Sequence, residues 1–102
     1  MVKVVWTETA ISDLKAIGEY IAKDSARYAE RVVSELFEAV DILENYPNIG
    51  VIVPEFNNEL IRQLTRGSYR ILHLIVNEAR IDILTVHDCA RLVSNHCCPV
   101  KI

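Results

Sequence analysis

The sequence predicts an α+β domain in which a twisted, mainly antiparallel sheet is covered on one face by an N-terminal helical hairpin. Three observations lead to this prediction: a strand-like run at the start of the chain, two stretches with helical periodicity, and three strand-like runs joined by tight turns between residues 60 and 87. The predicted order is β-α-α-β-β-β. With 102 residues, we expect the chain to form a single domain over residues 1–102.

The first strand and the first helix are predicted from local composition. Val2–Trp6 is rich in β-branched residues, which is typical of a short strand. Thr7 can cap a helix, and the helix dipole favours Glu8 in its first turn. From Glu8 to Lys23 the apolar residues recur at spacings of three and four, which predicts an amphipathic helix. Its apolar face consists of Ile11, Leu14, Ile17, Gly18 and Ile21.

A second amphipathic helix is predicted from Ala26 to Tyr46. Asp24-Ser25 interrupts the first helical pattern and offers an N-cap, while Pro47 cannot continue a helix. Because the link between the two helices is so short, they must lie antiparallel. The apolar residues of this helix are Val32, Val33, Leu36, Phe37, Val40 and Leu43.

The remaining elements are a connecting loop over residues 51–59 and three strands joined by two turns. Arg66-Gly67 fits a two-residue turn, and Asn77–Ala79 fits a three-residue turn. Since turns fix register, this reading places Tyr69 opposite His87. We expect the first strand to pair with one of these three strands, because a lone hairpin at an edge is marginally stable.

Alternation of side chains gives the sheet two faces, both rich in apolar residues. We expect the helical hairpin to cover the face with more β-branched residues, and a partner protein or the C-terminal tail to cover the other; of these we favour a partner. The helix-facing set is predicted to be Leu60, Arg62, Leu64, Tyr69, Ile71, His73, Ile75, Ile81, Ile83, Thr85 and His87. The opposite set is predicted to be Ile61, Gln63, Arg70, Leu72, Leu74, Val76, Leu84 and Val86.

Composition narrows the classes of function. The formal net charge of −3 argues against non-specific nucleic-acid binding, so we expect no direct DNA contact. No apolar run is long enough to span a membrane and no secretory signal begins the chain, so we expect a cytoplasmic protein with no membrane partner. Cys89, Cys97 and Cys98 have neither disulfide nor metal-site spacing, so we expect reduced thiols, no metal and no cofactor. The pattern ends after His87, and we expect a flexible tail from about residue 92.

Several stretches resemble the RelE/ParE toxin superfamily, in the same order along the chain. Residues 6–14 followed by 17–21 resemble the start of the superfamily's sequences, and residues 43–50 also resemble the family. Residues 69–72 and 83–87 resemble its central hairpin and terminal histidine. The resemblance implies a toxin of a type II toxin–antitoxin module. The partner in this hetero-oligomeric complex would be a small cognate antitoxin with a DNA-binding N-terminus and a C-terminal segment that wraps around the toxin.

The superfamily has two activities, and the first is cleavage of mRNA on the ribosome. RelE-like members use basic residues on the open sheet face to stabilise the scissile phosphate. Ile61 and Gln63 fall at the lysine-bearing positions of that set, while Arg70 falls at the sheet arginine. Arg91 is the nearest substitute for the arginine that follows the last strand. An isoleucine and a glutamine cannot stabilise phosphate charge as cations do, which argues against a ribonuclease.

The second activity is poisoning of DNA gyrase by protein–protein contact, without an active site. ParE-like members act in this way, and the chain resembles them better in residues 61–64, 69–71 and 86–87. We therefore expect a ParE-like, non-enzymatic gyrase inhibitor. The alternatives are a RelE-like ribosome-dependent endoribonuclease and a relative that has lost its toxicity, since Asp88-Cys89-Ala90 replaces a basic pair that often follows the histidine.

The candidate site is therefore a binding surface for target or antitoxin, with no catalytic residue. Arg70 is expected on the open face without an evident structural partner, which favours a binding role. Arg62 either pairs with a helix carboxylate or contributes to binding. Tyr69 and His87 are expected to pack as a cross-strand pair rather than to act as acid and base. The predicted binding set is Arg62, Tyr69, Arg70, Leu72, Leu74, Leu84, Val86, His87 and Arg91.

Overall fold

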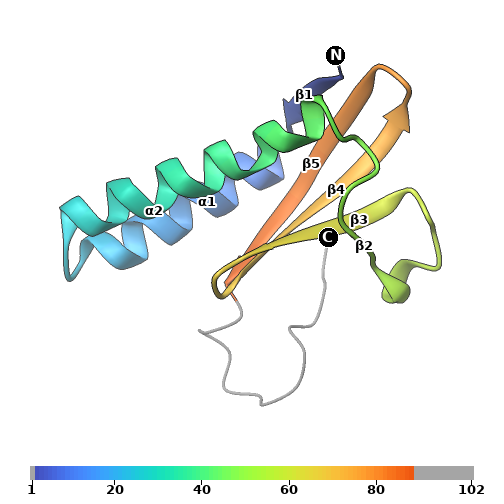
Figure 1. The fold of residues 1–102 in the computed structure, drawn as a ribbon. Coiled ribbons are helices and arrows are strands. Elements are labelled where there is room, and N and C mark those ends of the chain that lie inside the picture. The colour runs from blue at the N-terminus through green and yellow to red at the C-terminus, as the bar shows by residue number, and fades with distance from the viewer. Residues whose placement is uncertain (1, 89–102) are drawn as a thin grey trace.

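A computed structural model describes residues 2–88, except the side chain of Pro54, and confirms the α+β class (Figure 1). The described strands form one sheet in the order β1-β5-β4-β3-β2, in which β1 runs parallel to β5 and the other pairs are antiparallel. The first strand thus pairs with one of the last three, at an edge of the sheet. The elements are β1 (Lys3–Trp6), α1 (Glu8–Ala22), α2 (Ala26–Ala39), η1 (Val40–Glu44), β2 (Val51–Ile52), η2 (Pro54–Phe56), β3 (Ile61–Arg66), β4 (Tyr69–Asn77) and β5 (Arg80–Asp88).

Both helices begin at the predicted caps. The hydroxyl of Thr7 accepts the N–H of Ala10 at 3.3 Å, and the hydroxyl of Ser25 accepts that of Tyr28 at 3.1 Å. The α2 helix ends at Ala39 rather than at Tyr46 as predicted, and the chain continues as the 3₁₀-helix η1. The tighter winding suits this segment because Val40 and Leu43, three residues apart, then point the same way and are both buried.

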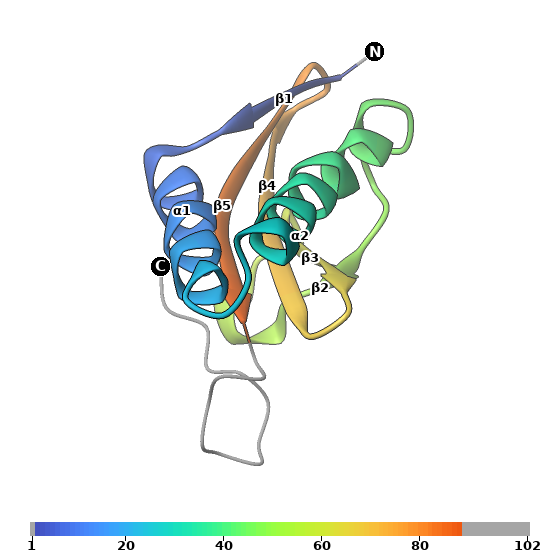
Figure 2. The ribbon, with the colours of Figure 1, turned by 90° about the vertical axis from the view of Figure 1, so that its left-hand side faces the viewer.

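The antiparallel helices pack on one face of the sheet and form the core with it (Figure 2). Two residues predicted for this core are largely exposed: Ile11 is 53% exposed and Phe37 is 52% exposed. Each follows a buried residue of its helix, so it is rotated about 100° away from the core. Phe37 instead stacks on Trp6, with ring centroids 5.3 Å apart. The core contains Ala10, Leu14, Ile17, Val32, Leu36, Val40, Leu43, Ile71, Ile81, Ile83 and Val86.

The first predicted turn is displaced by one residue, and the second is one residue shorter than predicted. The β3–β4 turn consists of Gly67-Ser68, because Arg66 pairs with Tyr69, and Gly67 has a φ of 60°. A positive φ at the first turn position is readily adopted only by glycine, which explains the placement. The β4–β5 turn consists of the two residues between Asn77 and Arg80. Moving the first turn by one shifts the pairing by two residues, so the side chains of β3 keep their predicted faces.

A bulge in β5 changes the faces predicted for its outer half. His73 pairs with Ile83, whereas Leu72 pairs with Thr85, so Leu84 is an extra residue without a partner across the strand. One inserted residue reverses the alternation of side chains beyond it. The sequence carries no turn or glycine signal for this irregularity, and the prediction therefore assumed a continuous ladder.

Several predictions are wrong because of this bulge. Thr85 was predicted in the helix-facing set but pairs with Leu72 of the open face. Val86 pairs with Ile71 and belongs to the helix-covered core instead of the open face. His87 pairs with Arg70 and so lies on the open face, where the sequence had not placed it. The predicted cross-strand pair of Tyr69 with His87 consequently does not form.

The outer half of β5 extends beyond β1, and α1 satisfies its exposed edge. The pairing with β1 ends at Ile83, whose carbonyl accepts the hydroxyl of Thr7 at 2.6 Å. Further along, the carboxylate of Asp13 accepts the backbone N–H of Val86 at 3.0 Å and the hydroxyl of Thr85. A helix side chain thus replaces a neighbouring strand, so these backbone groups are not left unpaired.

Replacement of Asp13 tests this edge closure. Asp13→Ala leaves the Val86 N–H and the Thr85 hydroxyl without their acceptor, and we expect it to lower the free energy of unfolding by about 1–3 kcal/mol. Asp13→Asn keeps one acceptor oxygen and is expected to lose less. Urea denaturation provides the measurement, with exposed Glu19→Ala on the same helix as control. Equal stabilities of the Asp13→Ala and Glu19→Ala variants would show that the helix does not close this edge.

Candidate functional site

The candidate site lies on the open face, which we define as the sheet face opposite the helices. Of the predicted binding residues, the structure brings Arg70, Leu72, Leu74 and His87 together on this face. Tyr69 and Val86 lie on the other face and pack against or within the core. Leu84 is the half-buried residue of the bulge, and Arg91 lies outside the described residues.

Arg70 has structural partners, contrary to the prediction. Its Nε donates to Oε1 of Gln63, its diagonal neighbour, at 2.7 Å, and its Nη2 donates to the same oxygen. Oε2 of Glu55, from η2, lies 3.8 Å from Nη2. The side chain of Arg70 is only 12% exposed. The guanidinium therefore joins β3, β4 and η2, and part of its charge is balanced within the chain.

The segment after β2 adds a small second core on the open face. Val53 and Leu72 are fully buried, and neither belongs to the main core cluster. Val53 continues the pairing of β2, since its N–H donates to the carbonyl of Ile61 at 3.1 Å, and the chain then turns into η2. Leu72 is consequently not part of an exposed patch as predicted, whereas Leu74 remains half-buried. The sequence suggested only a loop here, because a two-residue strand has no detectable periodicity.

His87 lies beside Arg70 on the open face, since the two residues pair across β5 and β4. The Nε2 atom of His87 is buried, and within residues 2–88 it has no hydrogen-bond partner. The two strands therefore place a half-buried ring next to a largely shielded guanidinium.

Arg62 holds two backbone segments together on the opposite side of the sheet. Its Nη1 donates to the carbonyl of Asn48 at 2.7 Å, and its Nε donates to the carbonyl of Glu59 at 3.2 Å. These acceptors are main-chain oxygens, and not a helix carboxylate as one alternative from the sequence had it. Arg62 therefore fixes the segment before β2 against the start of β3.

His73 is fully buried beside this clamp and faces Arg62 across the strands. Within residues 2–88, neither of its ring nitrogens has a hydrogen-bond partner of good geometry. Burial, followed by the positive charge of Arg62, lowers the pKa of His73 to about 4, and the backbone of Ile49 opposes this shift to a smaller extent. Gly50 packs against the ring: a Cβ there would lie 3.2 Å from Cε1 of His73 and 2.9 Å from the carbonyl oxygen of Gln63.

Comparison with known proteins identifies the family. The family model described as "ParE toxin of type II toxin-antitoxin system, parDE" matches residues 4–93. The chain belongs to the ParE toxin family. Membership confirms the resemblance to the RelE/ParE superfamily and makes the chain a toxin of the type II toxin–antitoxin class.

Individual relatives of this ParE-family toxin carry both superfamily names. It is 32% identical to Toxin RelE2 of Caulobacter vibrioides over 92 residues. The aligned region covers 90% of this chain and 100% of that protein. Its fold is similar to that of the chromosomal ParDE TA system from P. aeruginosa, with a TM-score of 0.70, 27% identity and coverage of 86% of this chain and 96% of the other. The toxin–antitoxin complex RelBE2 from Mycobacterium tuberculosis shares the fold, with a TM-score of 0.50, 24% identity and coverage of 85% and 96%.

The functional environment of the ParE-family toxin includes residues that sequence reasoning missed. Glu55 and Gln63 balance Arg70, and Asp13 closes the β5 edge. Gln63 could have been recognised as a partner, since the predicted faces already placed it beside Arg70. Glu55 and Asp13 carried no signal, because they meet their partners only through tertiary packing.

No helix among residues 2–88 is long and apolar enough to cross a membrane. Cys89, Cys97 and Cys98 lie outside the described residues.

The lowered pKa of His73 predicts an acid-sensitive fold. The folded state favours the neutral ring, so its stabilising effect is complete above pH 6.5 and is lost progressively as the pH falls from about 6.5 to about 4. We expect this histidine to account for a loss of about 3 kcal/mol over that range. Urea unfolding of wild type and His73→Leu across this range measures the difference, because the other titratable groups are common to both. Parallel pH profiles would contradict the assignment.

Proposed function

We propose that this toxin inhibits DNA gyrase by protein–protein contact, without catalysing a reaction. The observation that carries the proposal is the state of Arg70, which is mostly buried and engaged by Gln63 and Glu55. Cleavage of RNA without a metal requires cations directed at the scissile phosphate. Ile61 and Gln63 occupy the positions on the same face where the superfamily's ribonucleases would supply them. A mostly buried arginine, whose charge is partly balanced by Glu55, is better suited to a protein interface.

The proposed contact surface for the target is the exposed part of the open face. Leu74 and Leu84 are half-buried there, and the polar group of Arg70, Gln63 and Glu55 lies among apolar side chains. A fixed arginine within an apolar surround is typical of residues that dominate binding energy in protein interfaces. We include Arg91 in this surface from its place in the sequence.

The proposed second partner is a cognate antitoxin that neutralises the toxin in a hetero-oligomeric complex. Its expected form is a small protein with a DNA-binding N-terminus and a C-terminal segment that wraps around the toxin. The similarity to a protein of a ParDE TA system supports this partnership. We place both interactions in the cytoplasm, where gyrase acts on the chromosome.

Expression of the toxin alone in bacteria tests the target. We expect filamentous growth with an induced DNA-damage response, intact mRNA, and inhibition of DNA supercoiling by purified gyrase on addition of purified toxin. Rapid arrest of translation with mRNA cut on the ribosome would instead support the RelE-like endoribonuclease. Normal growth at a verified protein level would support a relative that has lost its toxicity.

Replacement of Arg70 tests the placement of the target surface. We expect Arg70→Ala to raise the toxin concentration needed for half-inhibition of gyrase at least about tenfold, which corresponds to about 1.4 kcal/mol of binding free energy. Arg31→Ala is the control, since that side chain is 75% exposed on α2 and forms only a surface ion pair with Glu35. Circular dichroism verifies that both variants are folded. Unchanged inhibition by folded Arg70→Ala toxin would show that the target binds elsewhere.

A further inference from the structure

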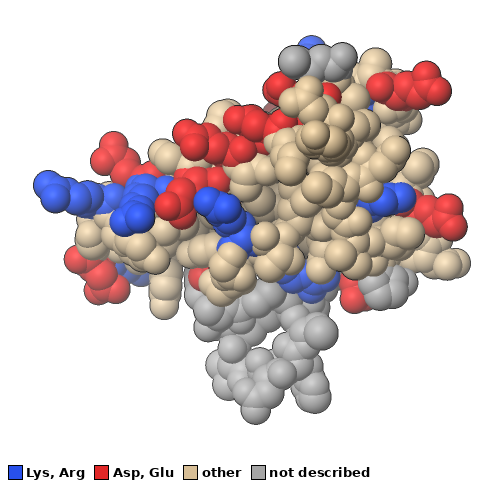
Figure 3. All heavy atoms as spheres, in the orientation of Figure 1, with Lys and Arg blue, Asp and Glu red and all other residues tan. Residues whose placement is uncertain are grey.

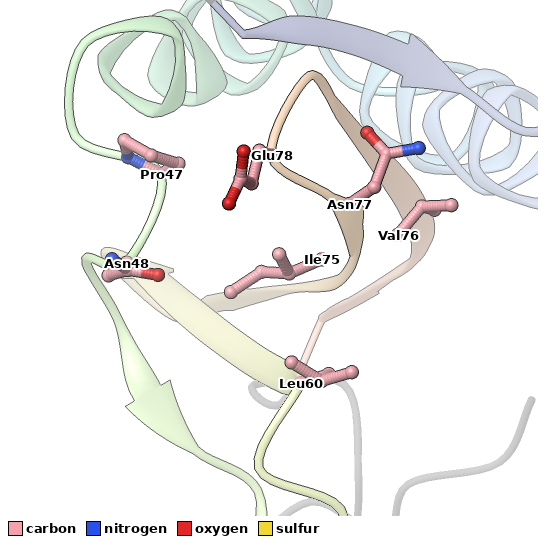
Figure 4. A pocket seen from close by; sticks show the side chains of 7 residues that line it. All are labelled: Pro47, Asn48, Leu60, Ile75, Val76, Asn77 and Glu78. Atoms are coloured by element: carbon pink, nitrogen blue, oxygen red, sulfur yellow. The ribbon is translucent and has the colours of Figure 1, made fainter.

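A hollow of about 340 Å³ opens beside the β4–β5 turn (Figure 4). It lies between the segment that follows η1, the start of β3 and the β4–β5 turn. Pro47, Leu60, Ile75 and Val76 supply its apolar side chains. Its volume is at the lower end of the range for ligand pockets, which suits one or two amino-acid side chains better than a cofactor.

The hollow belongs to a wider apolar surface. Leu60 is 48% exposed and Val76 is 42% exposed, and Tyr46, beside Pro47, is also exposed. Figure 3 shows uncharged side chains gathered over this part of the molecule, whereas acidic and basic side chains both lie along the helices. Contiguous apolar surface of this kind commonly marks a site of protein contact. Ile42, Ile49 and Ile52, on neighbouring segments, are exposed as well.

The walls of the hollow are held in place by the chain itself. Arg62 bonds the carbonyls of Asn48 and Glu59, so one guanidinium ties the segment before β2 to the start of β3. The N–H of Ile75 donates to the carbonyl of Leu60 at 2.9 Å, which ties the start of β3 to β4. A preorganised hollow binds more tightly, because less conformational freedom is lost on association. Arg62 is thus a positioning residue for this site.

We propose that this hollow receives an apolar side chain of the antitoxin, next to a basic antitoxin residue that faces Glu78. The inference rests on the antitoxin partnership proposed above and not on the identity of the target. Among residues 2–88, Glu78 is the one charged residue that lines the hollow, so a basic partner is complementary to it. The antitoxin fits as the occupant, because an exposed apolar surface requires a partner that stays bound. The target, in contrast, binds only after the antitoxin has released the toxin.

Isothermal titration calorimetry tests the proposal. The toxin is titrated with the purified protein that is encoded by the reading frame next to the toxin gene. We expect Leu60→Asp and Val76→Asp each to weaken binding at least about 30-fold, as for a central interface residue. Glu78→Gln is expected to weaken binding several-fold and to reduce its salt dependence. Tyr20→Asp is the matched control and should remain within about twofold of wild type. Its side chain is 48% exposed, as is that of Leu60, but it lies near the far end of the helical hairpin.

Unfolding curves separate a lost contact from a lost fold. If an aspartate variant is unfolded, Leu60→Ala and Val76→Ala replace it, and a loss of at least about fivefold is then expected. Binding within threefold of wild type by folded hollow variants would overturn the inference, as would an equal loss for Tyr20→Asp. Failure of the wild-type toxin to bind the adjacent product would refute the antitoxin partnership and this inference with it. The experiment measures antitoxin binding and not gyrase inhibition. A toxin that does not inhibit gyrase would therefore leave this inference unaffected.

Discussion

One helical hairpin can cover only one of the two apolar faces of this sheet, and much of the structure follows from that constraint. The hairpin forms the main core with the face of Ile71, Ile81 and Ile83. On the other face, the chain after β2 turns over the sheet and buries Val53 and Leu72. This partial cover leaves a half-open apolar surface, which a short chain cannot bury by itself.

The β-bulge at Leu84 determines how this surface is composed. By reversing the alternation in β5, it moves Val86 into the core and brings His87 beside Arg70. The same part of β5 has no neighbouring strand on the side of β1, and there Asp13 from α1 accepts the N–H of Val86. The position of the helix and the irregularity of the strand are therefore coupled, since a regular ladder would present different backbone groups to Asp13.

Two arginines on adjacent strands serve the chain's own structure. Arg62 bonds main-chain carbonyls that form the walls of the hollow, and Arg70 joins β3, β4 and η2 through Gln63 and Glu55. Neither guanidinium is presented to solvent as a free cation, because each is already hydrogen-bonded within the fold. This use of basic residues is consistent with a toxin that acts through protein contacts, and it gives two preorganised surfaces that different partners could occupy separately.

The sequence by itself determined the α+β class, the helix caps at Thr7 and Ser25, the faces of β3 and the resemblance to the toxin superfamily, because these depend on local periodicity, capping and turn chemistry. Tertiary structure alone decided the bulge, the two-residue strand β2, the partners of Arg70 and the hollow clamped by Arg62. Each of these joins residues far apart in the chain, and its geometry depends on how the helices and the β2–η2 segment pack on the sheet. Such packing leaves no periodic signal, so the sequence predicted a sheet face without helical cover but not which side chains lie on it.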